Sequence, residues 1–326
     1  MQIQTVKGPV AKQDFGFCHS HEHLFLAPGQ PSSLNPALCI DDYQRSVEEL
    51  LLFQSCGGRA IVDAQPLGCG RIESWLLEAS LATDIHIVAS TGFHKLSFYH
   101  DDHWIRKYEQ DRLTDLFVHE LTAGMFLRTD AAEPDNHMSA KAGVIKTAMD
   151  EDRMNDPDKR WFRAAASAAI RTGAPILCHI ESYAQAETLV HMYLELGVPA
   201  GQIIICHLDR KLDQLASHRK LGEMGVYLEY DTIARYKYHS DEEEALLIRQ
   251  MMEWGLEKQV LLGLDTTRER LKSYGGKIGL DFIRAHFMPL LKQTGIRDEH
   301  IRLMMIDNPA NAFAIRSSSS QTIRLN

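Results

Sequence analysis

The sequence predicts a single α/β domain of the (β/α)₈ TIM-barrel class over residues 1–326. Short apolar runs rich in β-branched residues occur eight times, and most precede a stretch with apolar residues three and four positions apart. Strands that alternate with helices pair in parallel, and eight such units close this barrel. The length of 326 residues fits a barrel of about 250 residues with insertions.

The predicted strands are the eight apolar runs. They are Asp14–His21, Arg59–Gln65, Ile85–Gly92, Gly143–Met149, Pro175–Ile180, Ile203–Leu208, Val226–Tyr230 and Val260–Asp265. The predicted helices are Asp42–Ser55, Arg71–Ala82, Asp158–Arg171, Tyr183–Leu196, Lys211–Met224, Asp241–Trp254 and Leu280–Thr294. Several glycines, such as Gly173 and Gly197, follow these helices where a glycine commonly ends one.

The third unit is irregular, because residues 94–140 separate its strand from the fourth without a clean second core. A long insertion after a strand is more often a lid or a substrate-shaping element than a separate domain. We therefore expect an insertion or lid within the barrel domain. The tail, 316–326, contains the low-complexity run Ser317–Ser320 and is expected to be frayed.

Composition excludes several classes of protein. With 35 basic and 44 acidic residues the net charge is −9, and 44% hydrophobic and 24% charged residues exclude disorder and fibrous repeats. The acidic balance argues against nucleic acid as the main partner. No apolar stretch approaches the roughly 20 residues of a membrane span, and the first residues lack a signal-peptide core, so we expect a cytoplasmic protein without membrane association.

The segment FCHSHEH, residues 17–23, places histidines at positions 19, 21 and 23. On a strand, alternate residues face one side, so two of these imidazoles could bind one cation if that side is the barrel interior. A lone strand histidine is usually a core residue, whereas three at alternate positions favour metal binding. Spacing alone does not choose between the pairs His19/His21 and His21/His23.

Other strand ends carry similar candidates. His179, His207 and Asp265 each end an apolar run, where barrel enzymes place catalytic groups. Each alone could be a helix cap or a loop residue, but together with the first-strand histidines they predict one site. Lys146 lies within the apolar fourth strand, and a buried ammonium must be paired, neutralised or chemically altered. A structural salt bridge and a carbamylated lysine that bridges two cations are both possible interpretations.

In order and spacing, these elements resemble the phosphotriesterase family of the amidohydrolase superfamily. The resemblance begins at Gly16-Phe17, ends at Asp307-Asn308-Pro309-Ala310 and thus covers nearly the whole chain. It implies a hydrolase with two divalent metal ions, bridged by a carbamylated lysine and a hydroxide. The implied ligands are His21, His23 and Asp265 for one metal, His179 and His207 for the other, and Lys146 for both. Zinc is the expected metal, and Mn, Co or Fe would suit the same ligands.

Asp265, beside the hydroxide, is the expected general base. Asp209 is two residues beyond His207. It is a candidate to hydrogen-bond a metal ligand and fix its orientation or, alternatively, to cap a helix. True phosphotriesterases have an Asp-His pair after the seventh strand, whereas here Asp231 precedes Thr232. This departure argues against efficient organophosphate hydrolysis.

The loops after strands seven and eight contain six cations against one carboxylate, Glu269. Barrel enzymes commonly bind phosphate there, although a solvated basic rim is the alternative. The predicted substrate contacts are Arg235, Lys237, Arg268 and Tyr274. We therefore expect a lactonase that opens a phosphorylated sugar lactone. A homodimer is a possible assembly of the protein. The alternatives are a phosphotriesterase or another carboxylic-ester or phosphoester hydrolase and, in a different class, a catalytically inactive metal-binding barrel.

Overall fold

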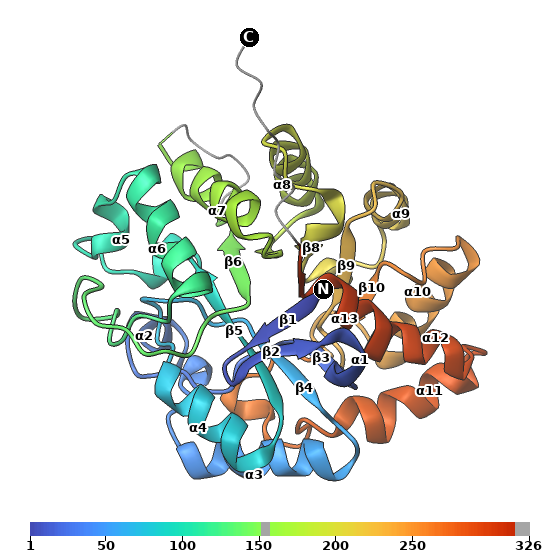
Figure 1. Ribbon diagram of the computed structural model, residues 1–326. Coiled ribbons are helices and arrows are strands. Elements are labelled where there is room, and N and C mark those ends of the chain that lie inside the picture. Colours follow the sequence, from blue (N-terminus) through green and yellow to red (C-terminus); the bar gives the residue numbers. More distant parts are fainter. Residues whose placement is uncertain (151–156, 317–326) are drawn as a thin grey trace.

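A closed barrel of eight parallel strands forms the centre of the computed structural model, which describes residues 1–150 and 157–316 (Figure 1). The barrel strands are β3 Cys18–Glu22, β4 Ala60–Asp63, β5 His86–Gly92, β6 Val144–Ala148, β7 Ile176–His179, β8 Ile203–Ile205, β9 Tyr227–Tyr230 and β10 Val260–Leu262. Each strand pairs in parallel with the next in the chain. The predicted (β/α)₈ class is confirmed.

Hydrogen bonds join the last barrel strand to the first. The backbone N–H of Asp265 donates to the carbonyl of His21 at 3.0 Å. Glu22, between two of the predicted ligands, accepts from the backbone N–H groups of Leu264 and Thr266 at 3.0 and 3.2 Å. This buried carboxylate therefore fixes the ends of β3 and β10 beside each other.

Helices surround the barrel as a ring (Figure 1). The longer ones are α3 Tyr43–Ser55, α4 Glu73–Thr83, α6 Gln110–Thr122, α7 Lys159–Thr172, α8 Tyr183–Glu195, α9 Leu215–Glu223, α10 Asp241–Glu253 and α11 Met288–Gln293. The shorter α-helices are α1 Lys12–Phe15, α2 Gln30–Leu34, α5 Trp104–Lys107, α12 Asp298–Arg302 and α13 Asn308–Ala312. Capping residues explain two of the starts: Asp42 accepts from the N–H of Arg45 in α3, and Ser240 forms a capping box with Glu243 in α10.

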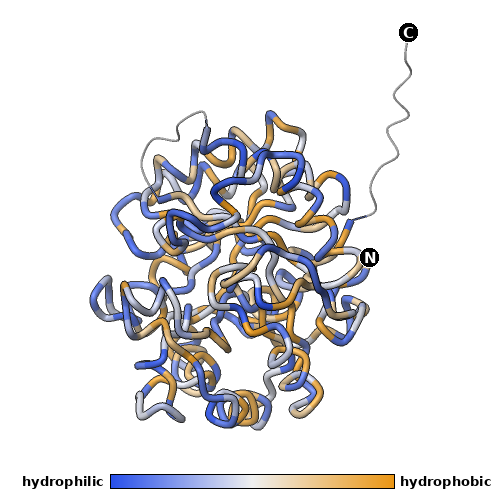
Figure 2. The backbone as a smooth tube through the Cα atoms, turned by 90° about the vertical axis from the view of Figure 1, so that its left-hand side faces the viewer, coloured by the Kyte–Doolittle hydropathy of each residue, from blue (hydrophilic) through white to orange (hydrophobic). Residues whose placement is uncertain are grey.

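The amino-terminal end of the barrel is filled by apolar side chains. Val62, Val88, Leu177 and Leu261 pack there with Phe313, which follows α13. An antiparallel sheet of β1 Gln2–Thr5, β2 Gly8–Ala11 and β11 Ala314–Ile315 crosses the same end (Figure 1). Hydrophobic segments run through the middle of the molecule, and hydrophilic ones are common in the outer loops (Figure 2). Because apolar side chains fill the amino-terminal end, we expect the polar residues of a site at the carboxyl ends of the strands.

Two predicted elements differ most from the observed ones, and several others begin or end a few residues away from their predicted bounds. The first strand begins at Cys18 rather than Asp14, because Asp14 lies in the short helix α1. The predicted helix 280–294 is divided into a π-helical turn, Ile283–Phe287, and α11. Pro289 follows at the second position of α11, and a proline there cannot donate the backbone hydrogen bond of a continuous helix.

Residues 94–140 include the third barrel helix. α6 packs against α7 and β5, as a barrel helix does, so this part of the segment is not an addition to the barrel. A buried ion pair ties α6 to the preceding unit, because Arg71 donates to both carboxylate oxygens of Glu120 at 2.9 and 2.6 Å. A lid role for the remainder stays a prediction. In the predicted tail, the backbone N–H of Arg316 donates to the carbonyl of Gly173 at 3.0 Å. Residues 317–326 lie outside the described part of the chain.

Within the described parts of the chain, no helix has both the length and the apolar character of a membrane span.

Candidate metal centre and substrate cavity

Three of the predicted ligands meet where the first and last barrel strands end. His21 and His23 come from the end of β3, and Asp265 follows β10. The Nε2 atoms of His21 and His23 lie 3.9 and 3.4 Å from the Asp265 carboxylate. The ligand atoms of all three residues lie within 4.8 Å of one another, which suits a single metal ion.

His19 does not share the face of His21, contrary to the expectation from strand alternation. The register of β3 against β4 shifts between His19 and Glu22, as at a β-bulge. The His19 ring instead packs 4.6 Å from that of Phe53 in α3, and its Nδ1 lies 2.8 Å from Glu22. Of the two possible pairs, the structure therefore brings together His21 and His23.

Lys146 lies in the middle of β6 and is fully buried. Its Nζ is 3.2 Å from Nε2 of His21, and among the described residues it forms no ion pair. Residues 1–150 and 157–316 thus offer Lys146 no acidic partner for a salt bridge. An amine that is buried beside a metal-type imidazole suits a carbamate, which would replace the cation by an oxygen ligand.

His179, the last residue of β7, and His207, which follows β8, form the second group. Nδ1 of His179 and Nε2 of His207 lie 2.7 Å apart. The other ring nitrogens face carboxylates, with His179 Nε2 at 2.9 Å from Glu181 and His207 Nδ1 at 2.7 Å from Asp231. Burial lowers the pKa of His207 to about 3, with Arg210 acting in the same direction, and burial also lowers the pKa of His179. Both rings are therefore neutral, as metal ligands must be.

Asp265 and His207 adopt left-handed backbone conformations, with φ of +47° and +60°, which are uncommon for residues other than glycine. The Asp265 carboxylate lies 3.0 Å from Arg235 and 3.8 Å from Arg210. Burial opposes its ionisation, but Arg235 and the neighbouring imidazoles outweigh burial and hold the pKa of Asp265 well below its usual range. Asp265 is therefore an ionised carboxylate at neutral pH.

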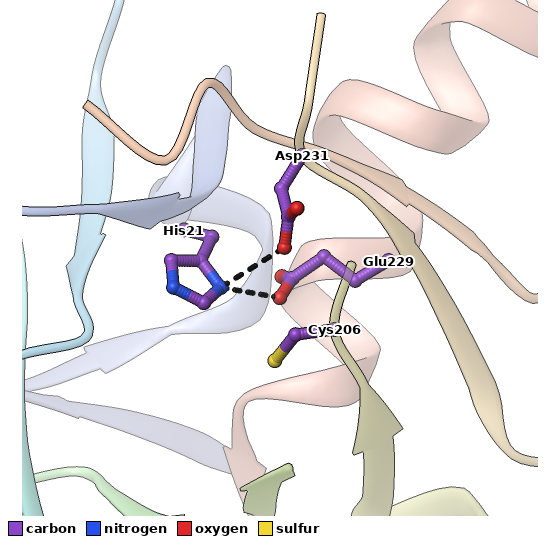
Figure 3. Close-up of side chains that lie close together, drawn as sticks. All are labelled: His21, Cys206, Glu229 and Asp231. Carbon is purple, nitrogen blue, oxygen red and sulfur yellow. Dashed lines mark hydrogen bonds and ion pairs between the residues drawn. The ribbon is translucent and has the colours of Figure 1, made fainter. Parts of the chain in front are cut away.

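Two buried acids that were not predicted as site residues contact the Nδ1 side of the His21 ring (Figure 3). Glu229 and Asp231 lie 2.8 and 3.2 Å from its Nδ1. Burial and Lys146 lower the pKa of His21, but the two carboxylates outweigh them and raise it to about 9. A metal ion at Nε2 would therefore have to displace a proton from this ring. The available signal was a pair of acids two residues apart at the end of an apolar run, because alternation turns both toward the same side.

Asp209 is fully buried but contacts the loop after β9 rather than a predicted ligand. Its carboxylate accepts from the backbone N–H of Thr232 at 2.6 Å. Burial and the nearby Asp231 raise the pKa of Asp209 to about 6. Its role as a second-shell partner stays a prediction.

Five of the six predicted ligands, all except Lys146, line a cavity of about 260 Å³. Four cationic side chains line it: Lys95, Arg210, Arg235 and Lys237. Arg235 and Lys237 were expected there, whereas Lys95 and Arg210 were not singled out. Glu181 lines the same cavity and pairs with Arg210 at 3.0 Å and with Lys95. A larger cavity, of about 590 Å³ beside Phe93, is lined by none of the predicted ligands.

Arg268 and Tyr274 lie outside the lining of the 260 Å³ cavity. The guanidinium of Arg268 pairs with Asp41 at 2.8 Å. The Tyr274 hydroxyl donates to the carbonyl of Asp42 at 3.0 Å. Both side chains therefore have partners within the protein, and their predicted contact with substrate is not tested.

A barrel that gathers four imidazoles and a carboxylate at the carboxyl ends of its strands, with a buried lysine beside them, has the architecture of a hydrolytic barrel enzyme. Comparison with known proteins makes the class specific: the chain belongs to the phosphotriesterase family, whose model matches residues 1–313.

Individual relatives cover nearly the whole chain. The sequence is 30% identical over 321 residues to a phospho-furanose lactonase of Mycoplasmopsis agalactiae, with 96% of this chain and 91% of the relative covered. A lactonase structure from Listeria monocytogenes has a TM-score of 0.88 at 26% identity and covers 97% of this chain and 100% of its own. A phosphotriesterase homology protein from Escherichia coli, with phosphate in its active site, has a TM-score of 0.83 at 25% identity, with 92% and 99% covered.

The protein is therefore a hydrolase that acts on ester bonds of a small-molecule substrate. Its family is metal-dependent, and its buried histidine and acidic groups could hold metal.

Proposed function

We propose that the protein is a binuclear metal-dependent lactonase that opens a phosphorylated sugar lactone. The observation that carries this proposal is the pair of ligand groups at one cavity, His21, His23 and Asp265 in one and His179 and His207 in the other. The buried Lys146 beside His21 supports a carbamate ligand common to both. Zinc is the expected metal, and Mn, Co or Fe would suit the same donors.

The donor atoms fit two ions on chemical grounds. His179 and His207 present neutral ring nitrogens 2.7 Å apart, and their remaining nitrogens face Glu181 and Asp231. Carboxylates behind ligating histidines fix the ring orientation and the tautomer. His21 is held in the same way, so its Nε2 is left for a metal.

Two divalent ions, when bound, would provide a hydroxide at neutral pH and polarise the ester carbonyl. The chain supplies the proton acceptor, since the Asp265 carboxylate is ionised and lines the cavity. Arg235 fixes that carboxylate from one side at 3.0 Å. Asp265 can thus take a proton from the attacking water and pass it toward the leaving oxygen.

The charge of the cavity supports an anionic substrate. Lys95, Arg210, Arg235 and Lys237 face it, whereas Glu181 and Asp265 are its carboxylates. A guanidinium can bind phosphate with two parallel hydrogen bonds. The names of the lactonase relatives and the phosphate in the Escherichia coli structure point in the same direction. Of the predicted contacts, Lys237 and Arg235 have the strongest support, and Arg268 and Tyr274 remain predictions.

The experiment compares kcat/KM for a phosphorylated lactone with that for the same lactone without phosphate. Lys237→Ala should lower the first value about ten- to a hundredfold, the loss expected for a charge-assisted contact, and barely change the second. Arg268→Ala tests the predicted phosphate contact from the loop after β10 in the same way. Lys292→Ala, which removes an exposed lysine paired with Asp298, is the matched control and should change neither value. Equal losses on both lactones, or a wild-type preference for the neutral one, would refute the phosphate site.

Two alternatives remain as outcomes of this test. Hydrolysis of organophosphate triesters or simple esters in preference to lactones would indicate a phosphotriesterase-like or general esterase. Thr232, where true phosphotriesterases have histidine, argues against the first. Metal binding without turnover of any ester would indicate an inactive metal-binding barrel. Cytoplasmic location and a homodimer stay predictions.

A further inference from the structure

Asp231 contacts one imidazole from each of the two ligand groups. It follows β9 and is fully buried. Its Oδ1 lies 2.7 Å from Nδ1 of His207, and its Oδ2 lies 3.2 Å from Nδ1 of His21. Oδ2 also accepts from the backbone N–H of His207 at 3.1 Å, which fixes the orientation of the carboxylate.

Glu229 differs from Asp231 although it lies only two residues away and is equally buried. Its Oε2 lies 2.8 Å from Nδ1 of His21, and its Oε1 has no hydrogen-bond partner among the described residues. Glu229 therefore reaches one of the ligand groups, whereas Asp231 reaches both. Figure 3 shows the two carboxylates converging on the His21 ring, Glu229 from β9 and Asp231 from the residue that follows this strand.

We propose that Asp231 is a shared positioning residue that holds one ligand of each metal ion at the same time. The inference rests on the proposed binuclear site and deepens it. In a neutral imidazole only one nitrogen carries a proton, so an acceptor at Nδ1 leaves the Nε2 lone pair for the metal. Asp231 would fix the tautomer of His207 by accepting from its Nδ1–H. Its charge, 3.2 Å from Nδ1 of His21, would favour the same tautomer of that ring, whose Nδ1–H Glu229 accepts.

This geometry makes the two metal affinities depend on one side chain. His207 has no other acceptor at Nδ1 among its described contacts, so the loss of Asp231 should free its ring to adopt the other tautomer. His21 retains Glu229, so its metal should weaken less. Changes of a carboxylate behind a histidine ligand typically cost 10- to 100-fold in metal affinity.

The test is a competitive Zn²⁺ titration of the metal-free full-length protein, which gives the affinity of each equivalent. Asp231→Ala should weaken both equivalents, one of them about 10- to 100-fold and the other by a smaller factor. Glu229→Ala, the matched control from the same strand, should weaken one equivalent and leave the other within about twofold. Cobalt(II) absorption of the loaded variants gives a second readout, in which Asp231→Ala alters the bands of both ions and Glu229→Ala those of one.

Thermal unfolding of the metal-free variants controls for misfolding. If Asp231→Ala does not fold, Asp231→Asn keeps the shape but must turn its NH₂ group toward one imidazole, and both equivalents should still weaken because the charge is lost. The inference is overturned if a folded Asp231 variant binds either equivalent as tightly as the wild type. Fewer than two Zn²⁺ ions on the wild type would overturn the binuclear proposal itself.

Discussion

Asp265 combines a left-handed backbone with an ionised carboxylate fixed by Arg235 at 3.0 Å. A strained conformation persists where the surroundings determine it, and here the Asp265 N–H is also bonded to the carbonyl of His21. The carboxylate is thereby held at the cavity beside His23. This placement suits a proton acceptor whose position does not change during turnover.

Asp265→Asn should lower kcat on the order of 10²-fold or more, since an amide can coordinate metal but cannot accept the proton. Metal content, measured by elemental analysis, should stay near that of the wild type. Asp213→Asn, at an exposed aspartate, is the control and should retain full activity. Near-normal turnover by metal-loaded Asp265→Asn would assign the proton transfer to another group, such as Asp209 or bulk water.

A second prediction concerns the proposed carbamate on Lys146. Its buried amine has no described ion pair, and the proposed carbamate would form by reaction of this amine with carbon dioxide. Activity of the metal-free protein after addition of Zn²⁺ should therefore recover faster with bicarbonate than in buffer depleted of carbon dioxide. Lys146→Met should show no such bicarbonate effect. Recovery at the same rate in both buffers would contradict carbamylation.

Single residues also show what sequence could not reveal. Strand alternation predicted that His19 and His21 share a face, but a bulge in β3 turns them apart. A bulge arises from pairing between strands, which a local pattern does not contain. The residues that end apolar runs, such as His179 and His207, were predictable because parallel strands bring their carboxyl ends to one rim.

At the scale of elements, the loops after β9 and β10 show how partners from elsewhere change the meaning of a charge count. Sequence predicted that both loops bind phosphate. Lys237 and Arg235 do line the cavity, whereas Arg268 pairs with Asp41 from the segment before α3. Counting cations in one loop cannot detect an acid that another loop supplies. Lys95 and Arg210 were not predicted because they follow β5 and β8, outside the two loops in which cations were counted.

The helix α6 depends on a buried ion pair between Arg71 and Glu120. Removing one partner of such a pair leaves a buried charge uncompensated, so Glu120→Ala should lower the free energy of unfolding by about 3–5 kcal/mol. Urea denaturation measures this value. Glu223→Ala, which breaks the exposed pair with Arg219, should cost about 1 kcal/mol or less. Similar small losses in both variants would show that the buried pair does not anchor α6.

In the whole molecule, the eight barrel strands and the helices of seven units could be predicted because each carries its own apolar pattern. The helix of the third unit, α6, lies in the segment expected as an insertion. The order of those units and the rule for parallel strands then determine the barrel. The antiparallel sheet that closes the amino-terminal end was not predicted. Its partners, β1 and β11, come from opposite ends of the chain, and two short strands give little local signal.

Stability should fall in mild acid because buried imidazoles cannot take up protons. Burial lowers the pKa of His218 to about 4, and its Nδ1 lies 2.9 Å from the Tyr230 hydroxyl. An unfolded histidine has a pKa of about 6.5, so between pH 6.5 and 4 the unfolded chain binds more protons and the free energy of unfolding decreases as pH falls. His218→Gln should reduce this slope by up to about 1.4 kcal/mol per pH unit. Equal slopes in the two proteins would contradict the assignment.

Ester hydrolysis by the proposed site requires two metal ions, and metal reconstitution measures this requirement. The metal-free protein is titrated with Zn²⁺ while the hydrolysis of a phosphorylated lactone is measured at each step. Activity should rise from near zero and reach its plateau at two equivalents per chain, because each group of ligands would hold one ion in the proposed site. Full activity at one equivalent, or activity that does not depend on added metal, would contradict the binuclear site.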